Sequence, residues 1–313
     1  MKTKITFILL LTSVIVLAQN TFTTTEVQIT NLVSGTLYMP AKNNLQTNLV
    51  IVIAGSGPTN RDGNQQGLTN NSLKMLCESL ANSGTAAFSF DKRIIAQMKT
   101  GTIDENTLRF NDMIDDAKSV ITHFKLQKKY DKIIVAGHSE GSLIGMVAAN
   151  GNSNAFISLS GAGRPIDEIL EEQIVKQMPS IKTVLRERLN DLKAEKLIDP
   201  ASIDPALAGM FRKSVQPYLI SWIQLNPQIE IKKLQIPVLI INGDKDIQVP
   251  ITDAVLLHQS LPTAKIEIIA NMNHIFKTIT GDDATNRASY TDPTLPISVD
   301  LLASINLFLR GLK

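Results

Sequence analysis

The feature that most constrains the fold is a regular alternation between short apolar runs and amphipathic stretches. The apolar runs are rich in aliphatic and aromatic side chains, as expected of strands buried on both faces, and occupy residues 49–54, 85–91, 133–136 and 155–159. Stretches with helical spacing of apolar residues lie between them, at residues 72–80, 108–126 and 142–149. This alternation predicts a mostly parallel sheet flanked by helices on both faces and joined by right-handed crossovers.

The pattern changes on both sides of this segment. Two strands that would form an antiparallel hairpin precede it, at residues 24–30 and 32–39. A strand, a helix, a strand and a final helix come late in the chain, at residues 238–241, 253–261, 265–269 and 297–309. Between these parts, residues 166–197 and 207–225 are amphipathic and carry no strand pattern. We therefore expect a helical insertion between two strands of one sheet.

The 313 residues are enough for one large α/β domain with an inserted sub-domain. We expect the first part of the core at residues 19–162 and the second at residues 231–313. Residues 163–230 would form a helical lid insertion between them.

Residues 1–18 have the features of a signal peptide. Lys2 and Lys4 provide a positive start, residues 5–17 are almost wholly apolar, and a small-residue cleavage site follows. A membrane anchor is the alternative, but the apolar run is shorter than the roughly 20 residues that span a bilayer. The sequence therefore predicts an exported protein, periplasmic or secreted, that begins at Gln19 and keeps no stable membrane anchor after signal removal.

Charge and cysteine content narrow the functional classes further. The formal net charge of +2 creates no field that would favour nucleic acid or an anionic membrane, so no nucleic-acid partner is expected. The single cysteine, Cys77, cannot form an internal disulfide. Its apolar helical surroundings predict a buried, unreactive thiol.

The chemistry centres on the pentapeptide Gly-His-Ser-Glu-Gly at residues 137–141. It follows the strand at residues 133–136 and precedes an apolar helix, which is the strand–turn–helix context of a nucleophile elbow. Such a turn presents its hydroxyl at the carboxyl edge of the sheet. The motif alone arises by chance on the order of once in ten chains of this length. Its position after a buried strand makes Ser139 the predicted nucleophile.

A serine nucleophile needs a base, and the chain has four histidines. His138 neighbours Ser139 and is expected to point elsewhere. His123 and His258 fall in predicted helices, so structural or solvent-facing roles are expected for all three. His274 lies in a polar loop just after a predicted strand, which brings it to the same sheet edge as Ser139.

The base needs an acid that holds its tautomer and stabilises the imidazolium. The loop after the strand at residues 238–241 offers Asp246 as first choice and Asp244 as second. The chain order Ser139, Asp246, His274 is that of α/β-hydrolases and differs from the orders in chymotrypsin and subtilisin.

An oxyanion hole needs backbone N–H groups aimed at the developing charge. One is expected from Glu140, directly after the nucleophile. The other is expected from Ser56, with Gly57 as second choice, in the loop of residues 55–63 after the first buried strand. A phosphate-binding loop is disfavoured because no Gly-Lys-Ser/Thr ending is present.

Together, these segments resemble the α/β-hydrolase superfamily, in particular bacterial esterases and serine-aminopeptidase-like hydrolases with a Gly-Ser-Gly-Pro oxyanion loop. The segments are residues 53–63, 137–141, 246–250 and the loop that carries His274. The resemblance covers roughly residues 48–313 and implies the α/β-hydrolase fold. In such families the acid typically precedes a hydrophobic-Pro pair, as Asp246 precedes Val249 and Pro250, which favours Asp246 over Asp244.

The sequence departs from that family pattern in one loop and leaves several charged residues open. Relatives often carry Asp-x-Arg-Gly-x-Gly after the second buried strand, but here residues 91–95 lack the glycines, which implies a different loop and leaves the role of Arg93 open. Glu140 either points into a polar pocket or, as we favour, caps the helix that it opens or compensates the dipole of that helix. Arg61 and Asp62 either bind substrate or form a local ion pair that fixes their loop.

The function that fits best is hydrolysis of a carboxylic ester of a small or medium-sized substrate through an acyl-enzyme. Peptidase or thioesterase activity by the same residues is the first alternative, and Glu168, Glu171 and Glu172 are candidates to hold a substrate amine. A non-catalytic binding protein is the second alternative. No metal site is visible at ligand spacing, and no cofactor is expected.

Overall fold

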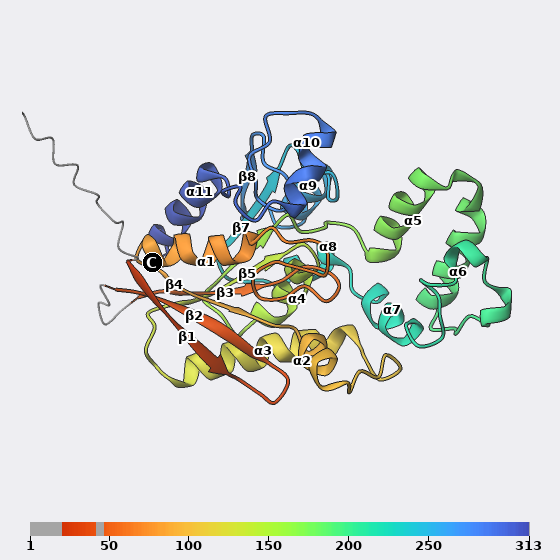
Figure 1. The fold of residues 1–313 in the computed structure, drawn as a ribbon, viewed down its shortest axis with the longest axis horizontal. Coiled ribbons are helices and arrows are strands. Elements are labelled where there is room, and N and C mark those ends of the chain that lie inside the picture. The colour runs from red at the N-terminus through yellow and green to blue at the C-terminus, as the bar shows by residue number, and fades with distance from the viewer. Residues whose placement is uncertain (1–20, 42–46, 313) are drawn as a thin grey trace, which may run out of the picture.

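The structure is a computed structural model that describes residues 21–41 and 47–312 (Figure 1). The predicted signal peptide therefore lies outside the described residues. One sheet dominates the architecture. Its strands are β1 (Phe22–Gln28), β2 (Ser34–Pro40), β3 (Leu49–Ile53), β4 (Ala86–Phe90), β5 (Ile133–His138), β6 (Ala155–Leu159), β7 (Val238–Gly243) and β8 (Lys265–Ile269).

The eight strands run in the order β1-β2-β4-β3-β5-β6-β7-β8. The hairpin β1–β2 is antiparallel, and β2 joins β4 in antiparallel fashion as well. All other neighbours are parallel, so the carboxyl ends of β3, β5, β7 and β8 lie at one edge. The mostly parallel sheet predicted from the apolar runs is confirmed.

Helices cover both faces of this sheet. They are α1 (Ser72–Asn82), α2 (Arg93–Thr100), α3 (Phe110–Leu126), α4 (Glu140–Ala149), α5 (Ile166–Gln177), α6 (Lys182–Lys193), α7 (Gln216–Ile223), α8 (Pro227–Lys232), α9 (Ile251–Ser260), α10 (Asp283–Ala288) and α11 (Val299–Arg310). Helices α1 and α11 pack on one face, and α3, α4, α8 and α9 on the other (Figure 1). Among the described residues, no helix is both long and apolar enough to cross a membrane.

Successive side chains of a strand feed opposite cores. Ile51 of β3 packs in the cluster beneath α3 and α4, whereas Val50 and Val52 pack in the cluster beneath α1 and α11. This alternation follows from the period of two along a strand and explains why the central strands are apolar throughout. Cys77 is buried in the second cluster, as predicted, and burial raises the pKa of its thiol to about 12.

Helices α5, α6 and α7 stand beside the sheet, between β6 and β7 in the chain (Figure 1). They enclose a third apolar cluster that includes Leu185, Leu189 and Phe211. The long helical stretch predicted at residues 166–197 is two helices, since the chain breaks at Pro179, which cannot continue α5. In the second predicted stretch, only α7 is α-helical.

Three local features differ from expectation. Helix α8 packs against α4 and α9 rather than in the insertion, so the boundary expected at residue 230 falls inside it. After residue 91, where we expected a loop unlike that of the family pattern, the chain forms helix α2. Arg93, its first residue, pairs with Asp112 and Asp116 of α3. Helix α10 was not predicted from the sequence.

Candidate active site

Ser139 sits in a strained turn between β5 and α4. Its backbone has φ 55° and ψ −122°, a conformation that is rare for a residue with a side chain. A Cβ on Gly137 would lie 2.1 Å from the carbonyl oxygen of Gly141, and one on Gly141 would lie 2.5 Å from that of Ile53. Both glycines of the pentapeptide are therefore required by close packing, and the turn has the form expected of a nucleophile elbow.

His274 and Asp246 form a buried pair. The Nδ1–H of His274 donates to Asp246 Oδ2 at 2.8 Å, with 4% and 0% of the two side chains exposed. The other carboxylate oxygen accepts the backbone N–H groups of Gln248 and Val249, at 2.8 and 2.9 Å. Burial raises the pKa of the Asp246 carboxyl, but the neighbouring His274 and these hydrogen bonds outweigh it and leave the pKa below its ordinary value. The acid is thus held as a carboxylate.

The second acidic candidate, Asp244, lies elsewhere. Its Oδ1 accepts the backbone N–H of Asn271 at 2.6 Å, and its side chain ties together the two loops that follow β7 and β8. The structure therefore brings Asp246, and not Asp244, against His274.

His138 makes a contact that the sequence did not reveal. It is buried, its Nε2 lies 2.9 Å from the carbonyl oxygen of His274, and the two ring centroids are 4.7 Å apart. Burial, together with the nearby His274, lowers the pKa of His138 to about 3, so the ring is neutral and Nε2–H donates. Since His138 directly precedes Ser139, this contact brings the His274 loop against the elbow. Its role is structural, as expected.

Buried amides hold the His274 loop from the other side. Asn273 donates to Asn286 at 2.9 Å and to Ser289 at 2.8 Å, and it accepts the backbone N–H of Lys277 at 2.9 Å. Asn286, on α10, donates in turn to the carbonyl oxygen of Lys245 at 2.7 Å. Helix α10 therefore links the loop of His274 to that of Asp246. Such a network has no sequence motif, because its members are far apart along the chain.

The predicted oxyanion donors line a common cavity. The carbonyl oxygen of Ser56 accepts hydrogen bonds from Thr59 Oγ1 at 2.7 Å and Gln65 Nε2 at 2.9 Å, which fixes the loop after β3. Glu140 is the first residue of α4, where backbone N–H groups have no partner within the helix. Ser56, Ser139 and Glu140 all border one cavity of about 450 Å³.

Glu140 is the acidic residue in the first turn of α4, the position expected for compensation of the helix dipole. It is buried and pairs with Lys92 Nζ at 2.7 Å, and Tyr218 of α7 donates to its other oxygen at 3.4 Å. Glu140 therefore lies at the start of α4 and also places its carboxylate in a polar pocket beside Ser139.

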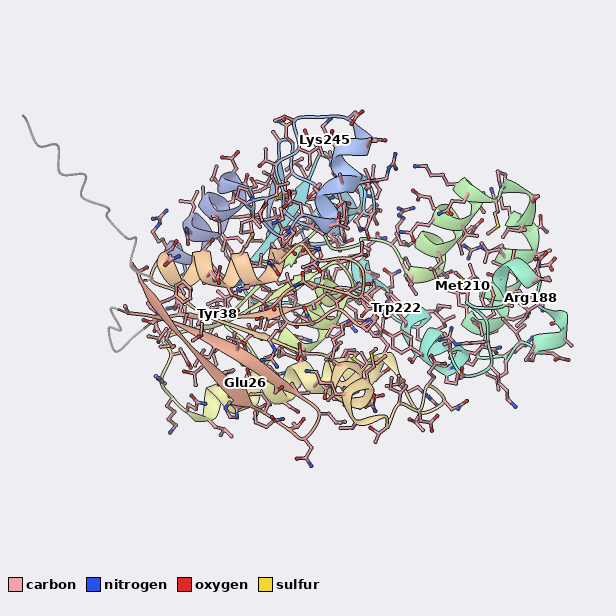
Figure 2. The ribbon with its side chains drawn as sticks, in the orientation of Figure 1. Glu26, Tyr38, Arg188, Met210, Trp222 and Lys245 are labelled. Atoms are coloured by element: carbon pink, nitrogen blue, oxygen red, sulfur yellow. The ribbon has the colours of Figure 1, made fainter. Side chains whose placement is uncertain are left out.

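The cavity at Ser139 lies between the sheet edge and the insertion. Its insertion wall includes the polar residues Arg164 and Gln173 but is mostly apolar, with Ile166, Ile169, Leu170, Met210, Val215, Leu219 and Trp222. Figure 2 shows Trp222 where the insertion meets the sheet, with Met210 farther out. A second cavity of about 210 Å³ shares Ser56, Glu140 and Trp222 with it.

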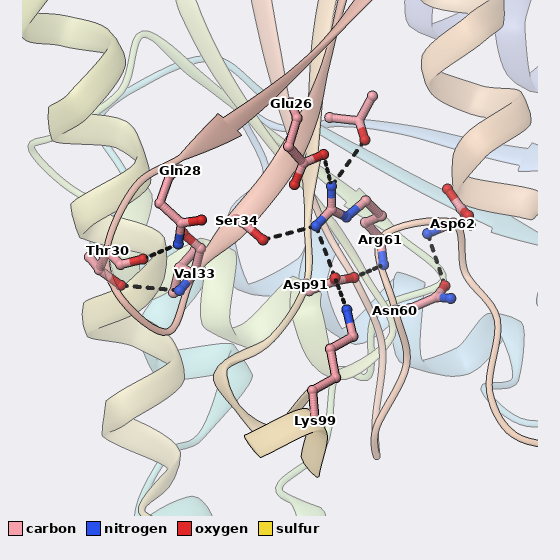
Figure 3. Close-up of polar contacts among 11 residues, drawn as sticks. Glu26, Gln28, Thr30, Val33, Ser34, Asn60, Arg61, Asp62, Asp91 and Lys99 are labelled. Atoms are coloured by element: carbon pink, nitrogen blue, oxygen red, sulfur yellow. Dashed lines mark hydrogen bonds and ion pairs between the residues drawn. The ribbon is translucent and has the colours of Figure 1, made fainter. Parts of the chain in front are cut away.

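The largest cavity, about 740 Å³, lies beside Arg61 and is bordered by none of the three predicted catalytic residues. Arg61 is engaged there by Glu26, by Asp91 at 2.9 Å and by Ser34 at 3.0 Å, and Asp62 is not among its partners (Figure 3). This cluster fixes the loop after β3. The smaller cavity is the one that Ser139, the predicted nucleophile, borders.

Other expected residues lie away from this site. Glu171 pairs with Arg186 and Glu172 with Arg164, while Glu168 is exposed on α5. His123 and His258 are half-buried on α3 and α9. Within residues 21–41 and 47–312, no group of three or more His, Cys, Asp or Glu side chains is placed to hold a metal ion.

The strand order, the strained elbow and the buried His–Asp pair after β8 and β7 together define the α/β-hydrolase fold. The model of the BD-FAE family matches residues 36–261, which is more than half of the chain. The chain belongs to the BD-FAE family.

Several known proteins are similar to this chain in sequence or in fold. Esterase EstD of Thermotoga maritima is 25% identical over 249 residues, which cover 77% of this chain and 57% of EstD. The chain thus spans little more than half the length of that relative. Among solved structures, Est1E from Butyrivibrio proteoclasticus superposes with a TM-score of 0.58 at 18% identity, covering 92% of this chain and 99% of Est1E.

Two further structures extend this likeness of fold. Est1E with ferulic acid bound has a TM-score of 0.53 at 19% identity, covering 88% of this chain and 96% of that one. An esterase from Pyrococcus furiosus has a TM-score of 0.55 at 14% identity, covering 93% of this chain and 91% of that one. Both support the fold assignment.

Proposed function

We propose that the protein is a serine hydrolase that cleaves a carboxylic ester of a small or medium-sized substrate. The observation that carries the proposal is the buried His274–Asp246 pair at the sheet edge where Ser139 occupies a strained elbow at a cavity. Asp246 fixes the His274 tautomer with Nδ1 protonated, which leaves Nε2 to accept a proton.

The reaction then proceeds through an acyl-enzyme. Ser139 Oγ attacks the ester carbonyl carbon while His274 Nε2 takes the hydroxyl proton. Backbone N–H groups of Ser56 and Glu140, with Gly57 as the alternative to Ser56, stabilise the oxyanion of the tetrahedral intermediate. Collapse expels the alcohol, which receives the proton from His274. Water attacks the acyl-enzyme by the same route and releases the acid.

We also propose that the insertion acts as a lid over the substrate. Its residues supply an apolar wall of the cavity at Ser139, including Leu170, Leu219 and Trp222. An apolar wall of this kind suits the acyl chain or the alcohol part of an ester.

An ester is favoured over an aminoacyl substrate by the state of the acidic side chains. Glu171 and Glu172 are already paired with arginines, and Glu168 is exposed on α5 and does not border the cavity at Ser139. Glu140 does border the cavity, but its carboxylate is paired with Lys92. The sequence relative EstD is also named an esterase. The substrate comparison described next distinguishes the ester assignment from thioester hydrolysis and from a non-catalytic binding role.

Turnover of a p-nitrophenyl acyl ester series, an aminoacyl p-nitroanilide and an acyl thioester tests the proposal. We expect ester hydrolysis by the wild type and a loss of at least about 10³-fold in Ser139→Ala. Ser142→Ala is the matched control, because that hydroxyl only contacts Ser158, at 2.8 Å, in the helix–sheet interface. Activity on the amide or thioester alone would replace the ester assignment, and no turnover of any substrate would favour a binding protein.

We further propose export to the periplasm or medium, on the basis of the charged and apolar pattern of residues 1–18. Fractionation of cells expressing the full chain should place the protein outside the cytoplasm. Its mass should be that of a chain that begins at Gln19. Full-length protein in the cytoplasm or the membrane would contradict this.

A further inference from the structure

Lys92 follows β4, and its side chain reaches the cavity that Ser56, Gly57 and Glu140 also line. The residue is 5% exposed, and its ammonium group lies 2.7 Å from Glu140 Oε1 and 3.4 Å from the carbonyl oxygen of Gly57. One buried side chain thus touches both segments that supply the proposed oxyanion donors, the loop of residues 55–63 and the first turn of α4.

This position differs from those of its two neighbours in sequence. Asp91 accepts the backbone N–H and the guanidinium of Arg61, at 2.9 Å each, at the far end of the same loop. Arg93 turns the other way and pairs with Asp116 of α3 at 2.8 Å. Of these three consecutive charged residues, Lys92 is the one that borders the active-site cavities, where it lines the pocket of about 210 Å³ with Ser56, Gly57 and Glu140.

We propose that Lys92 is a positioning residue that holds the two halves of the oxyanion hole in fixed relation by binding Glu140 and Gly57. The inference rests on the proposed function. Lys92 does not touch the reacting atoms in this scheme. It acts through the segments whose backbone N–H groups face the substrate carbonyl.

The chemistry of the pair explains why the constraint is stiff. Two opposite charges in a buried site form a strong directional contact, and removal of one leaves the other without a partner at high cost. Oxyanion donors act through their exact distance to the developing charge, so a small shift of Ser56 relative to Glu140 weakens them. Tyr218 of the insertion also contacts Glu140, so the insertion is connected to the same constraint.

The test compares kcat and KM of Lys92→Met with the wild type on a p-nitrophenyl ester. We expect kcat to fall about tenfold or more while KM changes less than about threefold, because the lost stabilisation belongs to the transition state. Affinity for a boronic acid, which forms a tetrahedral adduct on a serine nucleophile, should fall in parallel with kcat. A purely structural role would lower the melting temperature without this pattern.

Arg93→Met is the matched control, since it removes the two neighbouring ion pairs with Asp112 and Asp116 of α3, which do not involve the loop or α4. It should leave kcat within about twofold of the wild type.

A double-mutant cycle with Glu140→Gln tests whether Lys92 acts through its partner. The combined loss in Lys92→Met/Glu140→Gln should be clearly smaller than the product of the two single losses, as expected of residues in contact. The double variant also carries no unpaired buried carboxylate, so it serves if Lys92→Met alone does not fold, and it must still lose kcat about tenfold.

The outcomes separate this proposal from the proposed function. A wild type without ester turnover overturns the proposed function itself. An active wild type with a folded Lys92→Met variant of unchanged kcat overturns the positioning role, as do strictly multiplicative losses in the cycle.

Discussion

Three interactions, made by residues from different parts of the chain, fix the position of His274. Asp246 fixes one ring nitrogen, His138 donates to its carbonyl oxygen, and Asn273 anchors the loop just before it. Preorganisation of this kind keeps the second ring nitrogen in place without reorganisation during the reaction. The neutral state of His138 is part of this arrangement, since an imidazolium there would place a second charge against His274.

His138 should make stability depend on pH. Its pKa is lowered to about 3 in the folded chain, against about 6.5 when unfolded, so the unfolded state binds the extra proton between these values. This contribution to stability is present above pH ~6.5 and is lost as pH falls toward 3, at up to ~1.4 kcal/mol per pH unit. His138→Gln keeps an N–H donor and removes the titration. Urea unfolding from pH 7 to pH 5 should show a shallower loss of stability in the variant.

Parallel stability curves for the two proteins over this pH range would contradict the assignment of a neutral, buried His138.

At the residue scale, the sequence indicated some members of the candidate site but not others, and the sheet topology explains the difference. Ser139, His274 and Asp246 follow strands, and parallel strands deliver such residues to one edge, so their proximity could be inferred. The contact of Lys92 with Glu140 joins the ends of β4 and β5, which are not adjacent in the sheet. No pattern in the sequence encodes that distance.

Among the elements, the edge hairpin β1–β2 has a role beyond closing the sheet. Arg61, in the loop after β3, reaches Glu26 of β1 and Thr36 of β2, the latter at 3.1 Å, as well as Asp91 after β4 (Figure 3). The hairpin thereby clamps the loop that carries Ser56. The edge hairpin is thus connected to the loop that carries the proposed oxyanion donor Ser56.

Loss of this clamp should reduce turnover. Arg61→Met frees the loop, and we expect kcat/KM on a p-nitrophenyl ester to fall about tenfold, since small misplacements of donors are costly. Arg188→Met, which removes ion pairs within the insertion, is the control and should retain wild-type kcat/KM (Figure 2). If Arg61→Met lowers only the melting temperature and keeps kcat/KM, the clamp has no bearing on the site.

Elements were predictable where apolar periodicity is strong. The central strands and α3 were found within a few residues of their bounds, whereas α2 and α10 were missed. Helix α2 has no buried residue, and its start is held by the ion pairs of Arg93. Helix α10 is a short turn capped by Asp282. Both depend on tertiary contacts and not on a repeating apolar face.

On the scale of the whole molecule, three apolar clusters divide the described residues. Two lie on opposite faces of the sheet, and the third belongs to the insertion. The alternation of strands and helices predicted the first two. The sequence predicted a helical insertion but not how its helices lie against Ser139, because side-chain packing of α7 on α3 decides it, with Phe110 stacked on Trp222 at 5.1 Å.

The separate third cluster predicts that the insertion opens independently of the sheet. Leu189 on α6 and Leu76 on α1 are both fully buried, in the cluster of the insertion and in one of the two sheet clusters respectively. Each substitution to alanine should cost about 2–5 kcal/mol locally. By hydrogen exchange, Leu189→Ala should lower protection in α6 and α7 while the central strands stay protected, whereas Leu76→Ala should lower protection of the strands. Equal loss of protection throughout in Leu189→Ala would mean a single cooperative unit.

The central claim is that Ser139 is a nucleophile activated by His274. Its most direct test is the mass and position of the adduct that a fluorophosphonate forms with the purified protein. We expect one adduct per chain, mapped by peptide mass spectrometry to Ser139, absent in Ser139→Ala and formed at least about 10²-fold more slowly in His274→Ala. An ester-hydrolysing wild type that carries no adduct, or carries it on another residue, would contradict the assignment.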